Sequence, residues 1–238
     1  MSFVEDALKF HAEHNGMLAV ASKVPLNNRE DLALAYTPGV AEPCKAIKEN
    51  KELSFEYTCR GNTVAIVSDG TRVLGLGDIG PEAAMPVMEG KAVLFKTFGD
   101  VDAIPICIDT KDPEEIIETV RRLQPTFAGI NLEDFSSPKC YEIEDRLREI
   151  CDIPVFHDDQ HGTAIACLSA VMGALRYVKK DIKDVKVVVN GCGAAGSAIG
   201  RLFVSLGFPN VIMVERVGAL YKGLSLIHIS EPTRLGMI

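Results

Sequence analysis

Tryptophan is absent from this 238-residue sequence, aromatic residues make up only 6%, and there is no long hydrophobic run. A membrane-spanning helix needs about 20 consecutive, mostly apolar residues, and no stretch approaches that length. The first residues, Met1–Asp6, include acids where a secretory signal carries bases. Basic residues are fewer than acidic ones: there are 25 Lys and Arg and 33 Asp and Glu, which gives a net charge of −8. The sequence therefore predicts a cytoplasmic protein with neither a membrane nor a nucleic-acid partner.

No CxxC pair occurs among the seven cysteines, which are scattered at positions 44, 59, 107, 140, 151, 167 and 192. Zinc sites need closely spaced pairs, and a disulfide framework normally has an even number of cysteines. Reduced cytosolic thiols in core positions are therefore predicted. Apolar residues make up 47% of the chain, which is enough for a sizeable core.

Short apolar runs alternate with helical patterns, which predicts an α/β fold. Strands are expected at 63–67, 103–108, 127–132, 154–157, 185–189 and 211–214, and helices at 2–14, 41–50, 112–123, 137–150, 163–179 and 194–206. Residues 24–39 contain two prolines and are predicted to be a loop, and 86–95 are predicted to pass from helix into strand. The helix over 163–179 is apolar nearly all round, which predicts a buried helix that joins two domains.

A glycine-rich turn follows the predicted strand 185–189 and opens the next helix. It comprises Gly191, Gly193, Ala194, Ala195 and Gly196. Glycines at this spacing allow a tight turn and a close approach to pyrophosphate, which the helix N-terminus favours. Glu215 ends the next strand, 19 residues beyond Gly196, where an acid would bind ribose hydroxyls. The acid favours NAD, whereas the neighbouring Arg216 leaves NADP open; the alternative is a plain glycine turn.

This order of elements predicts two domains. A mixed α/β catalytic domain is expected over residues 1–160, followed by an incomplete Rossmann-like NAD(P)-binding domain over 161–223. With only two strands, that second part would leave an unpaired sheet edge.

Four acids form a second motif: Glu133, Asp134, Asp158 and Asp159. Taken alone, such acids are more often solvated loop residues. Each pair, however, follows an apolar strand, so all four should lie at one edge of a sheet, where ligand sites of α/β proteins form. Carboxylate oxygens suit a hard divalent cation. The nearby His157 and His161 are interpreted either as residues that donate hydrogen bonds to the metal ligands or as structural histidines whose hydrogen bonds are satisfied.

Four further side chains have both a structural and a chemical interpretation. Lys91 precedes the apolar stretch 92–95 and Lys96 follows it. A lysine held partly out of water has a lowered pKa and can act as a base, although a lysine at a strand end often has no such role. Tyr36 is either a proton donor or an ordinary half-buried phenol. Arg72 either binds a carboxylate or pairs at the surface.

Six strings in this order resemble the malic enzymes, especially the shorter bacterial type. They are YTPGVAEPC at 36–44, SDGTRVLGLGDIGPEAAMPVMEGKAVLFK at 68–96, DAIPICIDT at 102–110, GINLEDF at 129–135, IPVFHDDQHGTAIA at 153–166 and VVVNGCGAAGSAIGRL at 187–202. The resemblance implies oxidative decarboxylation of L-malate to pyruvate and carbon dioxide by a homodimer that uses NAD or NADP and Mg²⁺ or Mn²⁺. An alternative within the enzymes is a malolactic or oxaloacetate-decarboxylating relative.

The resemblance also implies a role for each candidate residue. Glu133, Asp134 and Asp159 would be the metal ligands. Lys91 would be the general base, and Asp158 would be a neighbouring acid that tunes either the lysine or the charge of the site. Tyr36 would be the general acid, and Arg72 would hold a malate carboxylate.

Residues 224–238 have no counterpart in the family. Their sequence, LSLIHISEPTRLGMI, is interpreted as a non-native tail joined in frame to a truncated gene. We accordingly expect the chain as written to be poorly soluble or inactive, and a non-catalytic nucleotide-binding fragment is the alternative from another class.

Overall fold

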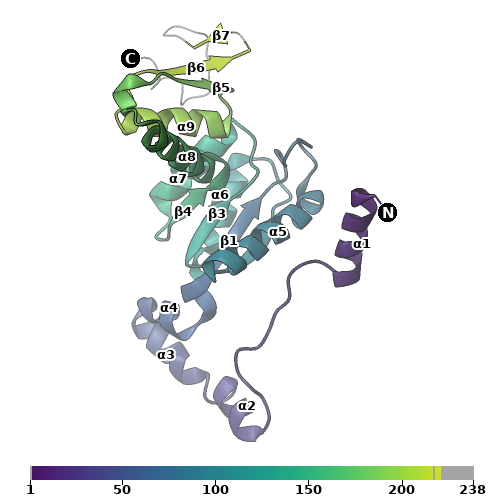
Figure 1. Ribbon diagram of the computed structural model, residues 1–238. Helices are drawn as coiled ribbons and strands as arrows, with labels where there is room; N and C mark the ends of the chain where they lie inside the picture. Colours follow the sequence, from purple (N-terminus) through teal and green to yellow (C-terminus); the bar gives the residue numbers. More distant parts are fainter. Residues whose placement is uncertain (1, 217, 221–238) are drawn as a thin grey trace.

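The computed structural model describes residues 2–216 and 218–220. It has the predicted α/β architecture, with two separate sheets flanked by helices (Figure 1). The tail over 224–238 lies outside the described residues. No helix within them is long and apolar enough to cross a membrane.

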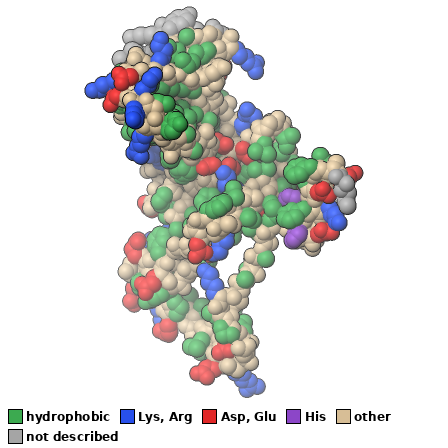
Figure 2. Space-filling view, viewed as in Figure 1, with side chains coloured by type: hydrophobic (Ala, Val, Ile, Leu, Met, Phe, Trp, Pro, Cys, Tyr) green, Lys and Arg blue, Asp and Glu red, His purple; other side chains and the backbone are tan. Residues whose placement is uncertain are grey.

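The N-terminal segment is mostly helical, and much of it stands apart from the first sheet (Figure 1), although Phe55 packs against the core of that sheet. It contains α1 (Phe3–His14), α2 (Arg29–Ala35), α3 (Ala41–Glu49), η1 (Lys51–Leu53), α4 (Ser54–Tyr57) and η2 (Cys59–Asn62). None of the helices α1 to α4 has a buried residue. Figure 2 shows hydrophobic side chains on the surface of this segment.

The first sheet is parallel and has the order β2-β1-β3-β4. Its strands are β1 (Thr63–Ser68), β2 (Asp102–Cys107), β3 (Gly129–Leu132) and β4 (Val155–His157), and its helices are α5 (Pro81–Gly99), α6 (Pro113–Leu123) and α7 (Lys139–Ile150), with η3 (Gln124–Thr126). Side chains alternate along a strand. Ala65 and Val67 of β1 therefore pack with α6 and α7, whereas Ile66 packs with Met88 of α5. All the candidate acids lie at the carboxyl edge of this sheet.

The second sheet has the order β5-β6-β7. Between the two sheets come η4 (Asp158–Gly162), α8 (Thr163–Val178) and η5 (Ile182–Asp184), and the second sheet region contains β5 (Val187–Asn190), α9 (Ala194–Ser205), β6 (Val211–Glu215) and β7 (Gly218–Ala219). The strand β7 pairs antiparallel with β6, so the prediction of only two strands was wrong. This strand has only two residues, which is too few to produce an apolar pattern in the sequence. The domain division near residue 160 stays a prediction.

Two element predictions were wrong because tertiary packing and capping outweighed proline. Residues 29–35 form α2 instead of a loop, since Asn28 caps the helix by accepting a hydrogen bond from the Asp31 N–H. The segment 86–95 belongs to one helix, α5, which continues through Pro86. Its buried residues Ala84, Met88 and Ala92 lie on one face and hold the helix against the sheet.

The helix α8 is also less buried than predicted. Only Ala164 and Leu175 are buried, whereas Ile165, Tyr177 and Val178 are more than half exposed. An apolar composition predicts that a helix has partners, but it does not place those partners on every face. Among the described elements, α8 packs mainly against α9 and η4.

Candidate active site

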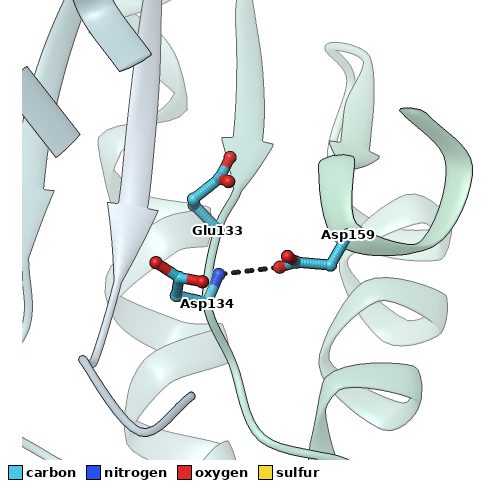
Figure 3. A group of neighbouring side chains, drawn as sticks. All are labelled: Glu133, Asp134 and Asp159. Carbon is cyan, nitrogen blue, oxygen red and sulfur yellow. Dashed lines mark hydrogen bonds between the residues drawn. The ribbon is translucent and has the colours of Figure 1, made fainter. Parts of the chain in front are cut away.

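Two parallel strands bring the acids together. Glu133 and Asp134 follow β3, and Asp159 lies in the turn η4 that follows β4. Because Leu132 pairs with His157 in the parallel register, the residues after them emerge side by side. One carboxylate oxygen from each of the three acids lies within 4.8 Å of the others. Figure 3 shows Glu133 and Asp134 on the segment that follows β3, with Asp159 reaching the Asp134 N–H from the neighbouring turn.

Hydrogen bonds fix this arrangement. The backbone N–H of Asp134 donates to Oδ2 of Asp159 at 2.8 Å, and Nδ2 of Asn131 donates to Oε2 of Glu133 at 2.9 Å. Asp134 has a φ of 58°, an uncommon left-handed conformation for a residue other than glycine. Its Oδ2 is buried and has no hydrogen-bond partner among the described residues. An orphaned carboxylate oxygen between two other acids is suited to receive a cation.

Burial raises the pKa values of two of these acids. The pKa of Glu133 rises to about 7, mainly because burial disfavours its charge, although Lys91 opposes the shift. The pKa of Asp134 rises to about 6, from burial and then from the charge of Asp159. An all-oxygen set with surplus negative charge fits a hard divalent cation such as Mg²⁺ or Mn²⁺.

Lys91 of α5 reaches the same cluster. Its Nζ donates to Oδ2 of Asp158 at 2.7 Å and lies 3.2 Å from Oε1 of Glu133. Burial alone would lower the pKa of Lys91, but the hydrogen bond to Asp158 and the charges of both acids outweigh it, so the pKa is raised. The prediction that the pKa of Lys91 is lowered was therefore wrong, because the sequence does not reveal which carboxylates face the amine.

Metal binding should depend on pH in a defined direction. Glu133 and Asp134 hold protons below their raised pKa values, and a proton competes with the cation. At pH values above 7, we expect Mg²⁺ to raise the melting temperature markedly. At pH values below 6, the rise should be much smaller. Without metal, the Glu133 contribution to stability should fall as the pH rises from its ordinary value of 4.5 towards 7.

Thermal melts with and without Mg²⁺ at several pH values measure this effect. The variant Glu133→Gln should lose the response, and Asp78→Asn, which changes an exposed acid paired with Lys111, should keep it. An equal Mg²⁺ response at all pH values would contradict the assignment of these ligands.

The loop after β1 carries Arg72 to the edge of the cluster. The Arg72 N–H donates to the Asp134 carbonyl at 2.9 Å, and its exposed guanidinium donates to the Leu74 carbonyl at 3.1 Å. A buried network holds the loop, in which Asp69 accepts from the Thr71 hydroxyl and pairs with Lys139 of α7. Arg72 is thus placed next to a candidate metal ligand while its charged group remains accessible.

The Asp69–Lys139 pair should matter for stability. Lys139→Met would leave the fully buried Asp69 carboxylate without its cation, so we expect the free energy of unfolding to fall by about 3 kcal/mol. Lys111→Met removes a lysine from an exposed pair with Asp78, and it should change stability by less than about 1 kcal/mol. Urea unfolding compares the two variants, and equal losses would contradict the expectation.

The glycine-rich turn has the geometry expected between β5 and α9. Gly191 has a φ of 97°, and a Cβ on Gly196 would lie 1.8 Å from the Gly191 carbonyl oxygen, so both positions require glycine. A Cβ on Gly193 would meet nothing within 4 Å, which leaves room for a ligand. Glu215 accepts from the Cys192 N–H at 2.8 Å, and this bond lowers the pKa of Glu215. The acid therefore lies at the turn.

Tyr36 is not brought to the acids. It caps the C-terminal end of α2 and is 68% exposed. Figure 1 places α2 beyond the amino ends of the strands, whereas the acids follow their carboxyl ends. Lys96 lies outside the cluster as well, in surface pairs with Asp100 and Asp102.

Sequence reasoning missed two residues of the site, Asn131 and Glu144. Asn131 is a polar residue within the buried strand β3, and Glu144 is an acid on the buried face of α7. In both cases a polar residue at a predicted core position was the available signal. His157 is fully buried and lies against Phe135, but neither ring nitrogen has a hydrogen-bond partner among the described residues, so its interpretation as a donor or structural residue stays a prediction.

Comparisons with known proteins agree in pointing to one family. The family model described as malic enzyme, N-terminal domain, matches residues 15–148. A bifunctional malic/malolactic enzyme from Bacillus subtilis is 54% identical over 94% of this chain, and a NAD-dependent malic enzyme from Geobacillus stearothermophilus is 56% identical over 87%. The chain spans only 54% and 43% of those two relatives' lengths.

Solved structures give the same picture. A NAD-dependent malic enzyme from Thermotoga maritima matches with a TM-score of 0.92 and 49% identity, covering 97% of this chain and 62% of that one. A malic enzyme from Pyrococcus horikoshii matches with a TM-score of 0.89 and 50% identity over 94% of this chain and 54% of that one.

Proposed function

The chain belongs to the malic enzyme family, and from that premise we propose that the full-length protein oxidatively decarboxylates L-malate to pyruvate and carbon dioxide with reduction of NAD or NADP. The observation that carries the proposal is the contact of Lys91 with Asp158 and Glu133 beside three clustered carboxylates. A base next to a cation site suits an α-hydroxy acid, because its hydroxyl proton and its hydride leave together.

Each described side chain then has a task. Glu133, Asp134 and Asp159, whose carboxylate oxygens cluster, would hold the Mg²⁺ or Mn²⁺ ion. When bound, the metal ion supplies a Lewis acid for the substrate oxygen, and the nicotinamide accepts the hydride.

Because the neighbouring acids raise the pKa of Lys91, its amine must first release its own proton, and it then takes the hydroxyl proton of malate. Asp158 orients the Lys91 amine through the 2.7 Å hydrogen bond. Arg72 pairs with a malate carboxylate.

A proton must finally reach the carbon from which carbon dioxide has left, and Tyr36 is the proposed donor. Within its own chain, Tyr36 caps α2, which lies beyond the amino ends of the strands (Figure 1), whereas Lys91 contacts acids at their carboxyl ends. We therefore place it in the site of a second copy within a homodimer. Leu34 and Tyr36 are 71% and 68% exposed, as expected of a segment that packs on a partner.

The cofactor assignment follows from the turn after β5. Gly191, Gly193, Ala194, Ala195 and Gly196 would bind the pyrophosphate, and Glu215 would bind the ribose hydroxyls and so favour NAD. Relatives named for NAD and for NADP both match, so NADP stays the second choice. No disulfide joins the cysteines within the described residues, which supports a reducing, cytoplasmic location.

A second candidate is malolactic conversion, because the relative from Bacillus subtilis is named for both activities. The test is an assay of the full-length protein with malate, each nucleotide and each metal, in which reduced nucleotide, pyruvate and lactate are all measured. Pyruvate formed in step with reduced nucleotide supports the proposal, and lactate without reduced nucleotide supports the alternative. Absence of both products would refute the proposed function.

A further inference from the structure

The turn η4 carries both the partner of Lys91 and a candidate metal ligand. Asp158 and Asp159 lie in its first two positions, and Gln160 and His161 follow. The turn is a short π-helix, a rare conformation that is frequent at functional sites. A turn of this kind needs support from outside to hold two carboxylates in fixed directions.

That support comes from Glu144 of α7. Its side chain is only 3% exposed, and its Oε2 accepts a hydrogen bond from Nε2 of the buried Gln160 at 2.8 Å. Nε2 of His161 lies 2.7 Å from Oε1 of Glu144. This second contact is short but poorly aligned for a hydrogen bond. One buried carboxylate thus contacts two consecutive side chains of the turn.

Close packing limits the turn on its other side. A Cβ on Gly162 would lie 2.1 Å from Oδ1 of Asp158, so the turn closes tightly over the Asp158 carboxylate. If Gln160 and His161 were to shift, Asp158 and Asp159 would have to shift with them because all four share one short turn. Asp159 would then move away from Asp134 and Glu133.

We propose that Glu144 is a positioning residue for the metal centre, which acts by anchoring η4 through Gln160 and His161 and so aims Asp159 at the cation. This inference rests on the proposed function only in taking Glu133, Asp134 and Asp159 as the metal ligands. Groups that orient metal ligands typically contribute 10- to 100-fold in metal affinity.

The experiment measures Mn²⁺ affinity by electron paramagnetic resonance on the full-length protein, with no turnover required. Glu144→Ala should weaken Mn²⁺ binding by about 10- to 100-fold, because Gln160 loses its buried acceptor. Glu144→Gln keeps an acceptor for Gln160 and should stay close to the unsubstituted protein. The matched control is Glu142→Ala, which changes an exposed acid on the same helix and should have no effect.

Folding is checked separately through circular dichroism and NAD affinity. If Glu144→Ala fails to fold, Gln160→Met removes the same hydrogen bond from the other side and should give the same loss of Mn²⁺ affinity. Unchanged Mn²⁺ affinity in the folded Glu144→Ala or Gln160→Met variant overturns the inference. So does an equal loss in Glu144→Gln, which would point to charge instead of position. Absence of Mn²⁺ binding by the unsubstituted protein would refute the metal site, and with it both this inference and the proposed function.

Discussion

Replacing Lys91 by alanine in the full-length protein is expected to lower kcat by about 10²- to 10⁴-fold, the range that a positioned general base contributes. Lys91 is the amine that contacts both Asp158 and Glu133, at 2.7 and 3.2 Å. The glycine-rich turn between β5 and α9 lies on other elements, so the affinity for NAD should stay nearly unchanged. Steady-state kinetics together with a direct NAD titration measure both quantities.

Two further variants separate proton transfer from charge and from folding. Lys91→Arg keeps a cation near both acids, but a guanidinium does not lose its proton in proteins, so this variant should be almost as inactive as Lys91→Ala. Lys96→Ala changes an exposed lysine on the same helix and should keep kcat. Activity near the unsubstituted level in Lys91→Arg would show that a positive charge suffices and that another group removes the proton.

The clustering of Glu133, Asp134 and Asp159 could be predicted from the sequence because it depends on local patterns, whereas their binding of a metal ion stays a prediction. Glu133 and Asp159 each follow a short apolar strand, and parallel strands deliver such residues to one edge of a sheet. The same reasoning applied to the turn after β5, where Gly191 and Gly196 have conformations or contacts that only glycine allows.

Features that depend on residues far apart in the sequence could not be predicted from local sequence patterns. Burial would lower the pKa of Lys91, but the pKa is raised because Asp158, 67 residues away in the chain, accepts a hydrogen bond from the Lys91 amine. The anchor Glu144 resembles any helical acid until its burial is seen. The exposure of Tyr177 and Ile165 on α8 likewise depends on which elements pack against this helix, and the composition of the helix does not specify those elements.

Mixing two inactive variants should restore activity if Tyr36 acts in the partner's site. Tyr36→Phe lacks the proton donor, and Lys91→Ala lacks the base. In a mixed dimer with exchanged segments, one site receives Lys91 from the first variant and Tyr36 from the second, and the other site receives neither. Random pairing in a two-fold dimer therefore predicts about a quarter of the unsubstituted activity.

A second mixing experiment distinguishes a Tyr36 that acts in the partner's site from a Tyr36 that acts in the site of its own chain. A chain carrying both Tyr36→Phe and Lys91→Ala is mixed with the unsubstituted chain. With exchange, each site of the mixed dimer lacks one of the two groups, so mixed dimers are inactive. If Tyr36 instead serves its own chain, the unsubstituted half keeps an intact site, and mixed dimers retain half of their activity.

The placement of α2 at the amino end of the sheet is what makes exchange the expected outcome. The link from Tyr36 to β1 runs through α3 and α4, which contact η1 and η2 near the start of the strand. Bringing Tyr36 to Lys91 of its own chain would require this whole segment to swing to the opposite edge of the sheet. A second copy related by two-fold symmetry can place its α2 there without any such rearrangement, and both copies then bury the exposed apolar side chains of the segment.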